Sequence, residues 1–111
     1  MDKLAIVIIT SDLGAIYNMA LMYGYNSKTK GWWQEVEIIF WGPATVALAT
    51  TPNLQSEIKK CLEAGIEVSA CRKCAENYDV VEKIESTGLA LYYIGEHLTD
   101  LLKSDAKVLT I

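Results

Sequence analysis

Two cysteines stand two residues apart in the stretch VSACRKCAEN, which spans residues 68–77. Cys71 follows a short strand-like run, and Arg72 and Lys73 separate it from Cys74. A cysteine reacts as its thiolate, and both positive charge and the free N–H groups at the start of a helix favour that form. The pattern therefore predicts a reactive thiol at Cys71. Two interpretations of Cys74 stay open, a thiol that resolves chemistry on Cys71 and a side chain that packs under the loop.

The third cysteine and the single histidine complete the set of residues that could hold a metal ion. Zinc usually takes four ligands, and Cys61, Cys71, Cys74 and His97 make up that number. The C-x-x-C pair alone supplies only half a site, and Cys61 lies on the apolar face of a predicted helix, where a core cysteine is expected. The sequence therefore predicts no metal. The odd number of cysteines also argues against a disulfide framework and for a reducing, cytoplasmic setting.

The size and charge of the chain limit the classes of protein to which it can belong. A chain of 111 residues is expected to form one domain, residues 1–111, and half of its residues are apolar. The net charge is −4, and no cluster of Lys and Arg is long enough to follow a phosphate backbone, so we expect no nucleic-acid partner. No apolar run approaches the roughly 20 residues of a membrane span. The opening MDKLAIVIIT reads as a buried first strand rather than a leader peptide.

Strand and helix signals alternate along the whole chain. Strands are predicted at 4–9, 36–41, 66–70, 89–94 and 106–111, and helices at 13–25, 44–49, 51–65, 79–88 and 95–104. Such an alternation with short connections predicts a parallel sheet with helices on both faces. The expected fold is an α/β three-layer sandwich with a five-stranded sheet and flavodoxin-like or Rossmann-like layering. No glycine-rich dinucleotide or triphosphate fingerprint follows the first strand.

Several helix starts carry recognisable caps. Ser11 or Asp12 can cap the first helix, Thr51 precedes a proline at the first position of another, and Asp79 with Glu82 has the spacing of a capping box. The first helix is apolar nearly all round, which indicates burial on more than one side. In so small a protein this predicts contact with another subunit.

In open parallel sheets, ligands bind outside the carboxyl ends of the strands. Three loops are expected there, and the candidate ligand-binding residues are Ser11, Asp12, Trp41, Gly42, Arg72, Lys73 and His97, beside the thiols Cys71 and Cys74. His97 starts the last helix, and two interpretations are open. It can act as a proton partner of Cys71, or it can be a solvated residue at a helix start.

Three segments resemble one known family. The turn FWGPA, the amphipathic run LQSEIKKCLEAGIEVSAC and the helix GEHLTDLL before a final short strand are similar to those of the DsrE-like family of small sulfur-relay proteins, and the likeness spans essentially the whole chain. The resemblance implies a three-layer fold with a five-stranded parallel sheet, assembly into trimers or hexamers, and no organic cofactor. In sulfur-transferring members a cysteine after the third strand carries sulfur as a persulfide, which by position is Cys71 here. Cys74 departs from the family pattern and leaves open whether Cys71 acts alone.

These observations combine into one functional expectation with two alternatives. We expect a cytoplasmic, homo-oligomeric sulfur carrier that holds sulfane sulfur on Cys71 and exchanges it with donor and acceptor proteins. One alternative is a non-catalytic module that binds a small ligand or a protein. The other is a dithiol redox switch formed by Cys71 and Cys74.

Overall fold

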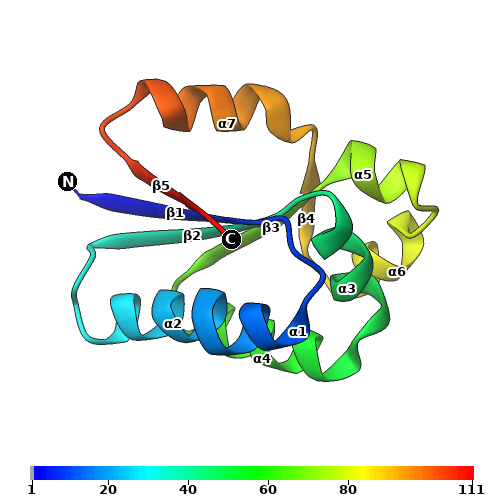
Figure 1. Ribbon diagram of the computed structural model, residues 1–111, viewed down its shortest axis with the longest axis horizontal. Helices are drawn as coiled ribbons and strands as arrows, with labels where there is room; N and C mark the ends of the chain where they lie inside the picture. Colours follow the sequence, from blue (N-terminus) through cyan, green and yellow to red (C-terminus); the bar gives the residue numbers. More distant parts are fainter. Residues whose placement is uncertain (1) are drawn as a thin grey trace.

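The fold is a single parallel sheet between two layers of helices (Figure 1). The computed structural model describes residues 2–111, so Met1 of the predicted domain lies outside the described residues. Within that range the sheet has five strands in the order β4-β3-β2-β1-β5, and every pairing is parallel. The strands are β1 (Lys3–Ile8), β2 (Glu35–Phe40), β3 (Glu67–Cys71), β4 (Ala90–Tyr92) and β5 (Lys107–Thr110). The predicted α/β class with helices on both sides of the sheet is confirmed.

The helices are distributed unequally over the two faces (Figure 1). One face is covered by a continuous helix built of α1 (Leu13–Ala15), the π-helical η1 (Ile16–Leu21) and α2 (Met22–Thr29), together with α4 (Pro52–Glu63). The opposite face carries only α7 (Ile94–Lys103). Three short helices gather at the carboxyl ends of the strands, α3 (Pro43–Thr50), α5 (Arg72–Asn77) and α6 (Val81–Glu85). None of the described helices is long and apolar enough to cross a membrane.

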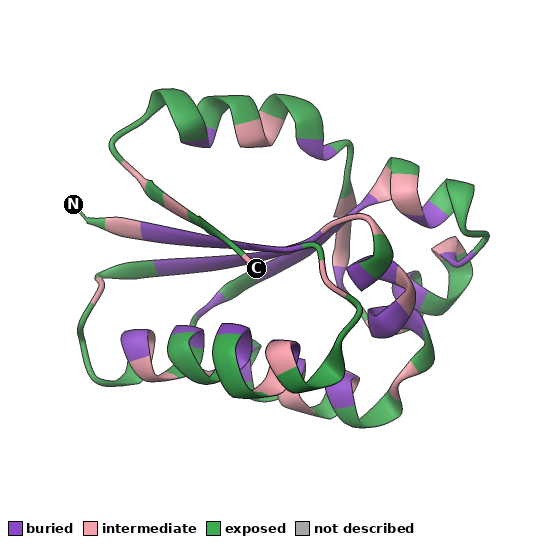
Figure 2. Ribbon diagram, in the orientation of Figure 1, coloured by how far each residue is buried: buried purple, intermediate pink, exposed green. Residues whose placement is uncertain are grey.

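The central strands are buried along most of their length (Figure 2), and their side chains alternate between two separate cores. In β1, Ile6 and Ile8 face the larger core, while Ala5 and Val7 face the smaller core under α7. A strand that is covered on both faces is apolar at every position, which is why β1 and β2 read as nearly continuous apolar runs. The same alternation sends Cys71 into the smaller core.

The first helix is longer than predicted. It ends at Thr29 rather than near Tyr25, and the polar residues 26–29 belong to its last turn. Ser27 is fully buried, and its carbonyl accepts hydrogen bonds from the backbone N–H groups of Trp32 at 2.9 Å and Trp33 at 3.2 Å. These bonds tie the end of the helix to the segment that leads into β2 and so offset the weak helix propensity of the polar residues.

The predicted caps are correct in one case out of three. Asp12 caps α1, since its Oδ1 accepts the Ala15 N–H at 2.9 Å. Thr51 occupies the cap position of α4, but its side chain makes no capping bond. The predicted capping box is wrong, because α6 starts after Val80 and Asp79 instead adopts a left-handed conformation with φ of 57°. Asp79 terminates the preceding helix α5, a role that short polar residues tolerate better than most.

Candidate functional site

The two cysteines meet at the junction of β3 and α5. Cys71 is the last residue of β3 and the cap residue of α5, and its Sγ accepts the backbone N–H of Cys74 at 3.4 Å. The chain therefore turns helical directly after Cys71, as the sequence predicted. This turn brings Cys74 one helical turn along, on the side of the sheet that carries the smaller core.

The two thiols differ in their access to solvent. Cys71 is 4% exposed and packs in the smaller core with Ile39 of β2 and Ile94 of α7. Cys74 is only partly buried. The sequence predicted an open position for Cys71 at the rim of the sheet, and the structure instead encloses its side chain. The reason is the strand register, since Cys71 shares a face with the side chains that α7 covers.

The loop after β2 contacts the thiol loop through Gly42. The Gly42 N–H donates to Cys74 Sγ at 3.3 Å. Gly42 has φ of 59° and ψ of −136°, a backbone conformation that residues with a side chain rarely adopt. Pro43 then starts α3, where its missing N–H is not needed. Trp41, directly before the glycine, is partly buried against the smaller core. Trp41 and Gly42 thus lie beside the thiols, as predicted.

The charges around the thiols are weaker than the sequence suggested. Arg72 Nε lies 3.5 Å from Glu76 Oε2, so its charge is largely compensated, and Lys73 is exposed to solvent. Burial raises the pKa of the Cys74 thiol, and the hydrogen bond with Cys71 raises it further, while the Gly42 N–H acts in the opposite direction. Cys74 therefore tends to hold its proton while it lies against Cys71.

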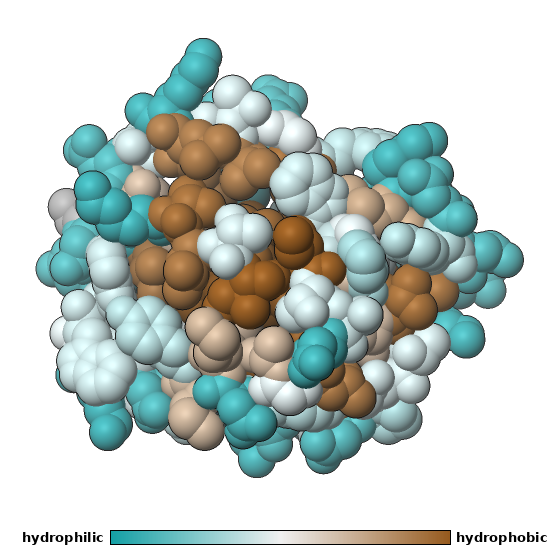
Figure 3. Space-filling view, in the orientation of Figure 1, coloured by the Kyte–Doolittle hydropathy of each residue, from teal (hydrophilic) through white to brown (hydrophobic). Residues whose placement is uncertain are grey.

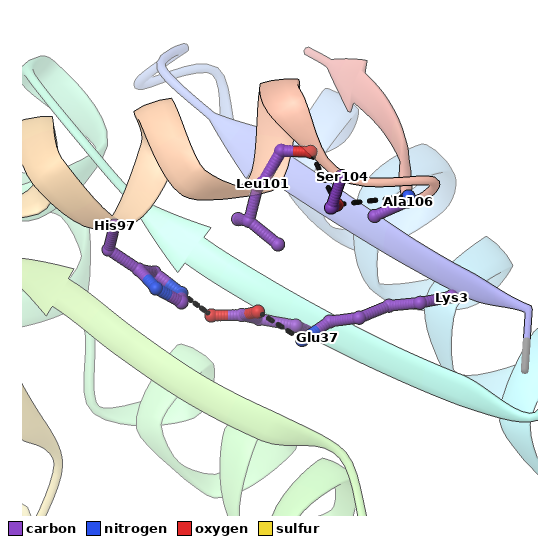
Figure 4. A network of polar contacts seen from close by, with 6 residues as sticks. All are labelled: Lys3, Glu37, His97, Leu101, Ser104 and Ala106. Carbon is purple, nitrogen blue, oxygen red and sulfur yellow. Dashed lines mark hydrogen bonds and ion pairs between the residues drawn. The ribbon is translucent and has the colours of Figure 1, made fainter.

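His97 takes part in a different interaction from either of the two predicted ones. Its Nε2 pairs with Glu37 Oε2, and Lys3 Nζ lies 3.0 Å from Glu37 Oε1 (Figure 4). The Glu37 side chain is 4% exposed, so its carboxylate is buried between the side chains of Lys3 and His97. His97 makes no hydrogen bond with Cys71 among the described residues. It connects α7 to β2 instead, and is neither a free surface residue nor a proton partner of the thiol.

Glu37 is the residue that sequence reasoning missed. It interrupts the apolar run of β2 at a position facing α7, between the exposed Glu35 and the buried Ile39. A charged residue in the middle of a strand that is otherwise buried on both faces is the signal that could have identified it.

A groove of about 560 Å³ runs from the thiol loop along β3 and β4, beside the start of α7. Arg72 borders it near the thiols, and Tyr92 and His97 form its walls. Four carboxylate residues, Glu37, Glu67, Glu96 and Asp100, make the groove acidic. Arg72 is the residue of the thiol loop that lines the groove, and neither Cys71 nor Cys74 does.

The remaining predicted residues take part in interactions other than those of the thiols. Ser11 is exposed, and the carboxylate of Asp12 is engaged in capping α1. Cys61 is 2% exposed in the larger core, and burial raises its pKa to about 11, as expected for an inert core thiol. Among residues 2–111, no group of three or more His, Cys, Asp or Glu side chains is arranged to hold a metal ion.

Comparison with known families agrees with this architecture. The family model described as DsrE/DsrF-like matches residues 2–111. The chain belongs to the DsrE/DsrF-like family. A similar solved structure is that of BT1422 from Bacteroides thetaiotaomicron, a conserved protein of unknown function. It is 39% identical, with a TM-score of 0.94, and the match covers 99% of this chain and 95% of that chain.

A second solved structure of the same fold is the YchN protein of E. coli. The match covers the whole of both chains with a TM-score of 0.74, but the sequence identity is only 16%, so this likeness concerns the fold. No curated protein sequence gives a significant match.

Proposed function

We propose that this member of the DsrE/DsrF-like family is a sulfur-relay protein that stores sulfane sulfur as a persulfide on Cys71. The observation that supports the proposal is the pair of thiols at the carboxyl end of β3, where Cys71 Sγ accepts the Cys74 N–H at 3.4 Å. Membership of the family supports it as well. A persulfide is easily hydrolysed, reduced or transferred to the wrong thiol, and the enclosure of Cys71 by Ile39 and Ile94 would protect it.

The chemistry needs no organic cofactor or metal. A thiolate attacks the outer sulfur of a donor persulfide and keeps that sulfur atom until an acceptor thiolate removes it. The backbone N–H of Cys74 would stabilise the charge on Cys71 Sγ when Cys71 is a thiolate, before it takes up the sulfur and after it gives the sulfur up. Donor and acceptor are themselves proteins with reactive thiols or persulfides, and the groove beside Arg72 offers them an approach to the loop.

An intact-mass experiment tests the proposal. The protein is incubated with a cysteine desulfurase and cysteine, and its mass is measured under non-reducing conditions. The wild type and Cys61→Ser should each gain about 32 Da, one sulfur atom, and the double variant Cys71→Ser/Cys74→Ser should gain none. Cys61→Ser is a matched control because that thiol lies in the other core. A wild type that stays unmodified would exclude the relay, as would a double variant that gains the same mass.

We also propose a homo-oligomer, a trimer or hexamer, as the working form. The helix from Leu13 to Ser27 carries no charged residue, yet Met19, Met22 and Tyr23 are 40–56% exposed. A second apolar surface lies over the β5 edge of the sheet (Figure 3), where Ile9 and Leu109 are exposed. Soluble monomers rarely expose two such surfaces. A hexamer built as two trimers requires two kinds of interface.

Light scattering coupled to size exclusion gives the subunit number. The wild type should elute as a trimer or hexamer, and Met22→Lys should dissociate it by placing a charge on the uncharged helix face. Leu62→Lys, on an exposed leucine of α4, serves as the control and should leave the mass unchanged. A wild type that is monomeric at micromolar concentration would refute this part of the proposal.

The three free cysteines fit a reducing cytoplasm, which we propose as the location.

The same thiol contact favours a second candidate, a dithiol redox switch. Cys71 Sγ accepts the backbone N–H of Cys74 at 3.4 Å, so the two cysteines adjoin across one turn at the start of α5. Titration of the free thiols against defined glutathione buffers separates the two functions. A reversible disulfide with a potential near that of the cytosol, together with no sulfur uptake, would favour the switch.

A further inference from the structure

We propose that Cys74 is the entry thiol of the relay: it takes the sulfur from the donor and passes it to Cys71. This inference rests on the proposed function, and it assigns to Cys74 a role that the family resemblance does not supply. Transfer of sulfur requires the attacking sulfur atom to reach the outer sulfur of the donor persulfide in line with the bond that breaks. A donor protein cannot bring its persulfide to a side chain that is 4% exposed, whereas the Cys74 side chain is partly open to solvent.

The residues packed around Cys71 prevent a donor protein from reaching its side chain. Its side chain belongs to the smaller core, together with the aliphatic residues Ile39 on β2 and Ile94 on α7. Each belongs to a packed strand or helix, so opening the pocket would separate α7 from the sheet. The hydrogen bond between His97 and Glu37 opposes that separation. Cys74, one turn along α5, is the neighbouring group that reaches both the surface and Cys71.

Contacts around Cys74 suit a thiol that is alternately protonated and ionised. The Cys74 N–H donates to Cys71 Sγ at 3.4 Å, so the two thiols adjoin and Cys71 can receive the proton of Cys74. Cys74 Sγ also accepts the Gly42 N–H at 3.3 Å. The Gly42 N–H is fixed in direction, because the glycine adopts a left-handed conformation between Trp41 and the start of α3. A donor N–H aimed at a sulfur stabilises the thiolate that appears when Cys74 becomes a leaving group.

In the first step, Cys74 attacks the outer sulfur of a donor persulfide, R–S–SH. Its proton passes to the Cys71 thiolate, a bond forms between Cys74 Sγ and the transferred sulfur, and the donor S–S bond breaks to release R–S⁻ with the electron pair. The departing R–S⁻ takes the proton of the new Cys74 persulfide beside it and leaves as R–SH, and the persulfide takes a proton in turn from Cys71, whose thiolate reforms. No oxidant or reductant is consumed, because the sulfane sulfur keeps its oxidation state.

In the second step, the Cys71 thiolate attacks the outer sulfur of the Cys74 persulfide. A bond forms between Cys71 Sγ and that sulfur, the Cys74 S–S bond breaks, and Cys74 departs as a thiolate that accepts the Gly42 N–H. Sulfur therefore moves from the accessible thiol to the enclosed one. Release to an acceptor reverses the order, so that Cys74 meets the acceptor as well.

Trypsin makes the two steps separately visible in the unmodified wild type. Arg72 and Lys73 lie between the cysteines, so cleavage after each puts Cys74 on the peptide from residues 74–83 and Cys71 on the peptide from residues 61–72. The second peptide also holds Cys61, and its fragmentation separates the two cysteines. The protein is mixed with a desulfurase that already carries a persulfide, alkylated at successive times, and digested. Alkylated persulfide should appear first on the Cys74 peptide and later on the Cys71 peptide. Appearance on Cys71 first, or on Cys71 with no earlier Cys74 phase, would overturn the proposal.

Single-cysteine variants provide the second arm. Cys74→Ser should slow the loading of Cys71 by about tenfold or more, since the entry route is lost. Cys71→Ser should leave the adduct on Cys74, and Cys61→Ser should load as the wild type does. Loading of Cys71 at the wild-type rate in Cys74→Ser would refute the entry role while leaving the relay function intact. Absence of sulfur from every cysteine of the wild type would instead mean that the relay function itself is wrong.

Discussion

The buried carboxylate of Glu37 provides the sharpest test of the physical reasoning about the α7 side of the sheet. Its side chain is 4% exposed, and Lys3 Nζ stands 3.0 Å from its Oε1. Replacing Lys3 with Met keeps an unbranched side chain only one atom shorter and removes its charge. This leaves a buried carboxylate with His97 as its one remaining basic partner among the described residues. Removing one partner of a fully buried pair costs about 3–5 kcal/mol of folding free energy.

The expected cost here is smaller, because the Lys3 side chain is 25% exposed and solvent screens part of the interaction. We expect Lys3→Met to lower the free energy of unfolding by about 2 kcal/mol at pH 7. Urea unfolding followed by circular dichroism measures this quantity, and Lys59→Met, on an exposed lysine of α4, should change it by less than about 0.5 kcal/mol. The double variant Lys3→Met/Glu37→Leu should regain most of the loss, since apolar replacements of a buried pair are tolerated.

The pH dependence of the same variant has a definite sign. Burial lowers the pKa of Lys3, but the hydrogen bond and the charge of Glu37 outweigh burial and raise the pKa above its ordinary value of 10.5. A raised pKa for a basic group means that its stabilisation is complete below pH 10.5 and is lost as the pH rises through the folded-state value. The difference between wild type and Lys3→Met should therefore be constant from pH 7 to 9 and shrink above pH 10.5. A difference below about 0.5 kcal/mol at pH 7 would refute the reasoning.

Three further predictions concern other parts of the fold. Burial raises the pKa of Cys61 to about 11, so this thiol should resist iodoacetamide at pH 8 in the folded protein and react within minutes in urea. Equal labelling in both states would contradict its place in the larger core. Asp12→Ala should cost about 1 kcal/mol in urea unfolding by removing the cap of α1, against no measurable change for Ser11→Ala, and equal effects would dispute the cap. Gly42→Ala should lower the free energy of unfolding by about 1–3 kcal/mol because Gly42 has a left-handed backbone. Gly95→Ala, inside α7 with open space around it, should be neutral or stabilising. The reverse order would be inconsistent with the loop geometry.

The order and type of the elements were accessible from the sequence, because they depend on local patterns. Continuous apolar runs identified the buried strands, and Gly42 followed by Pro43 marked the start of α3. The position of Cys71 at the exit of β3 followed from the same pattern, and so did the burial of Cys61 on the inner face of α4. The family resemblance pointed to the same sheet, and the structure confirms its parallel strands.

What the sequence did not reveal depends on residues that are distant along the chain. The pair of His97 and Glu37 joins positions sixty residues apart, and only the packing of α7 on β2 brings them together. The enclosure of Cys71 depends on strand register, because a shift of one residue would send its side chain to the other face. The left-handed backbone of Asp79 overrode the capping-box spacing, since the end of α5 imposed the conformation.

The central claim, that Cys71 is the residue on which sulfur is stored, is tested most directly by locating the sulfur in wild-type protein that has been loaded to completion. Loaded protein is alkylated under non-reducing conditions and digested with trypsin, and the peptide from residues 61–72 is fragmented. The account predicts one additional sulfur atom, about 32 Da, on Cys71 in most molecules. Sulfur found wholly on the peptide from residues 74–83, or on neither peptide, would contradict it.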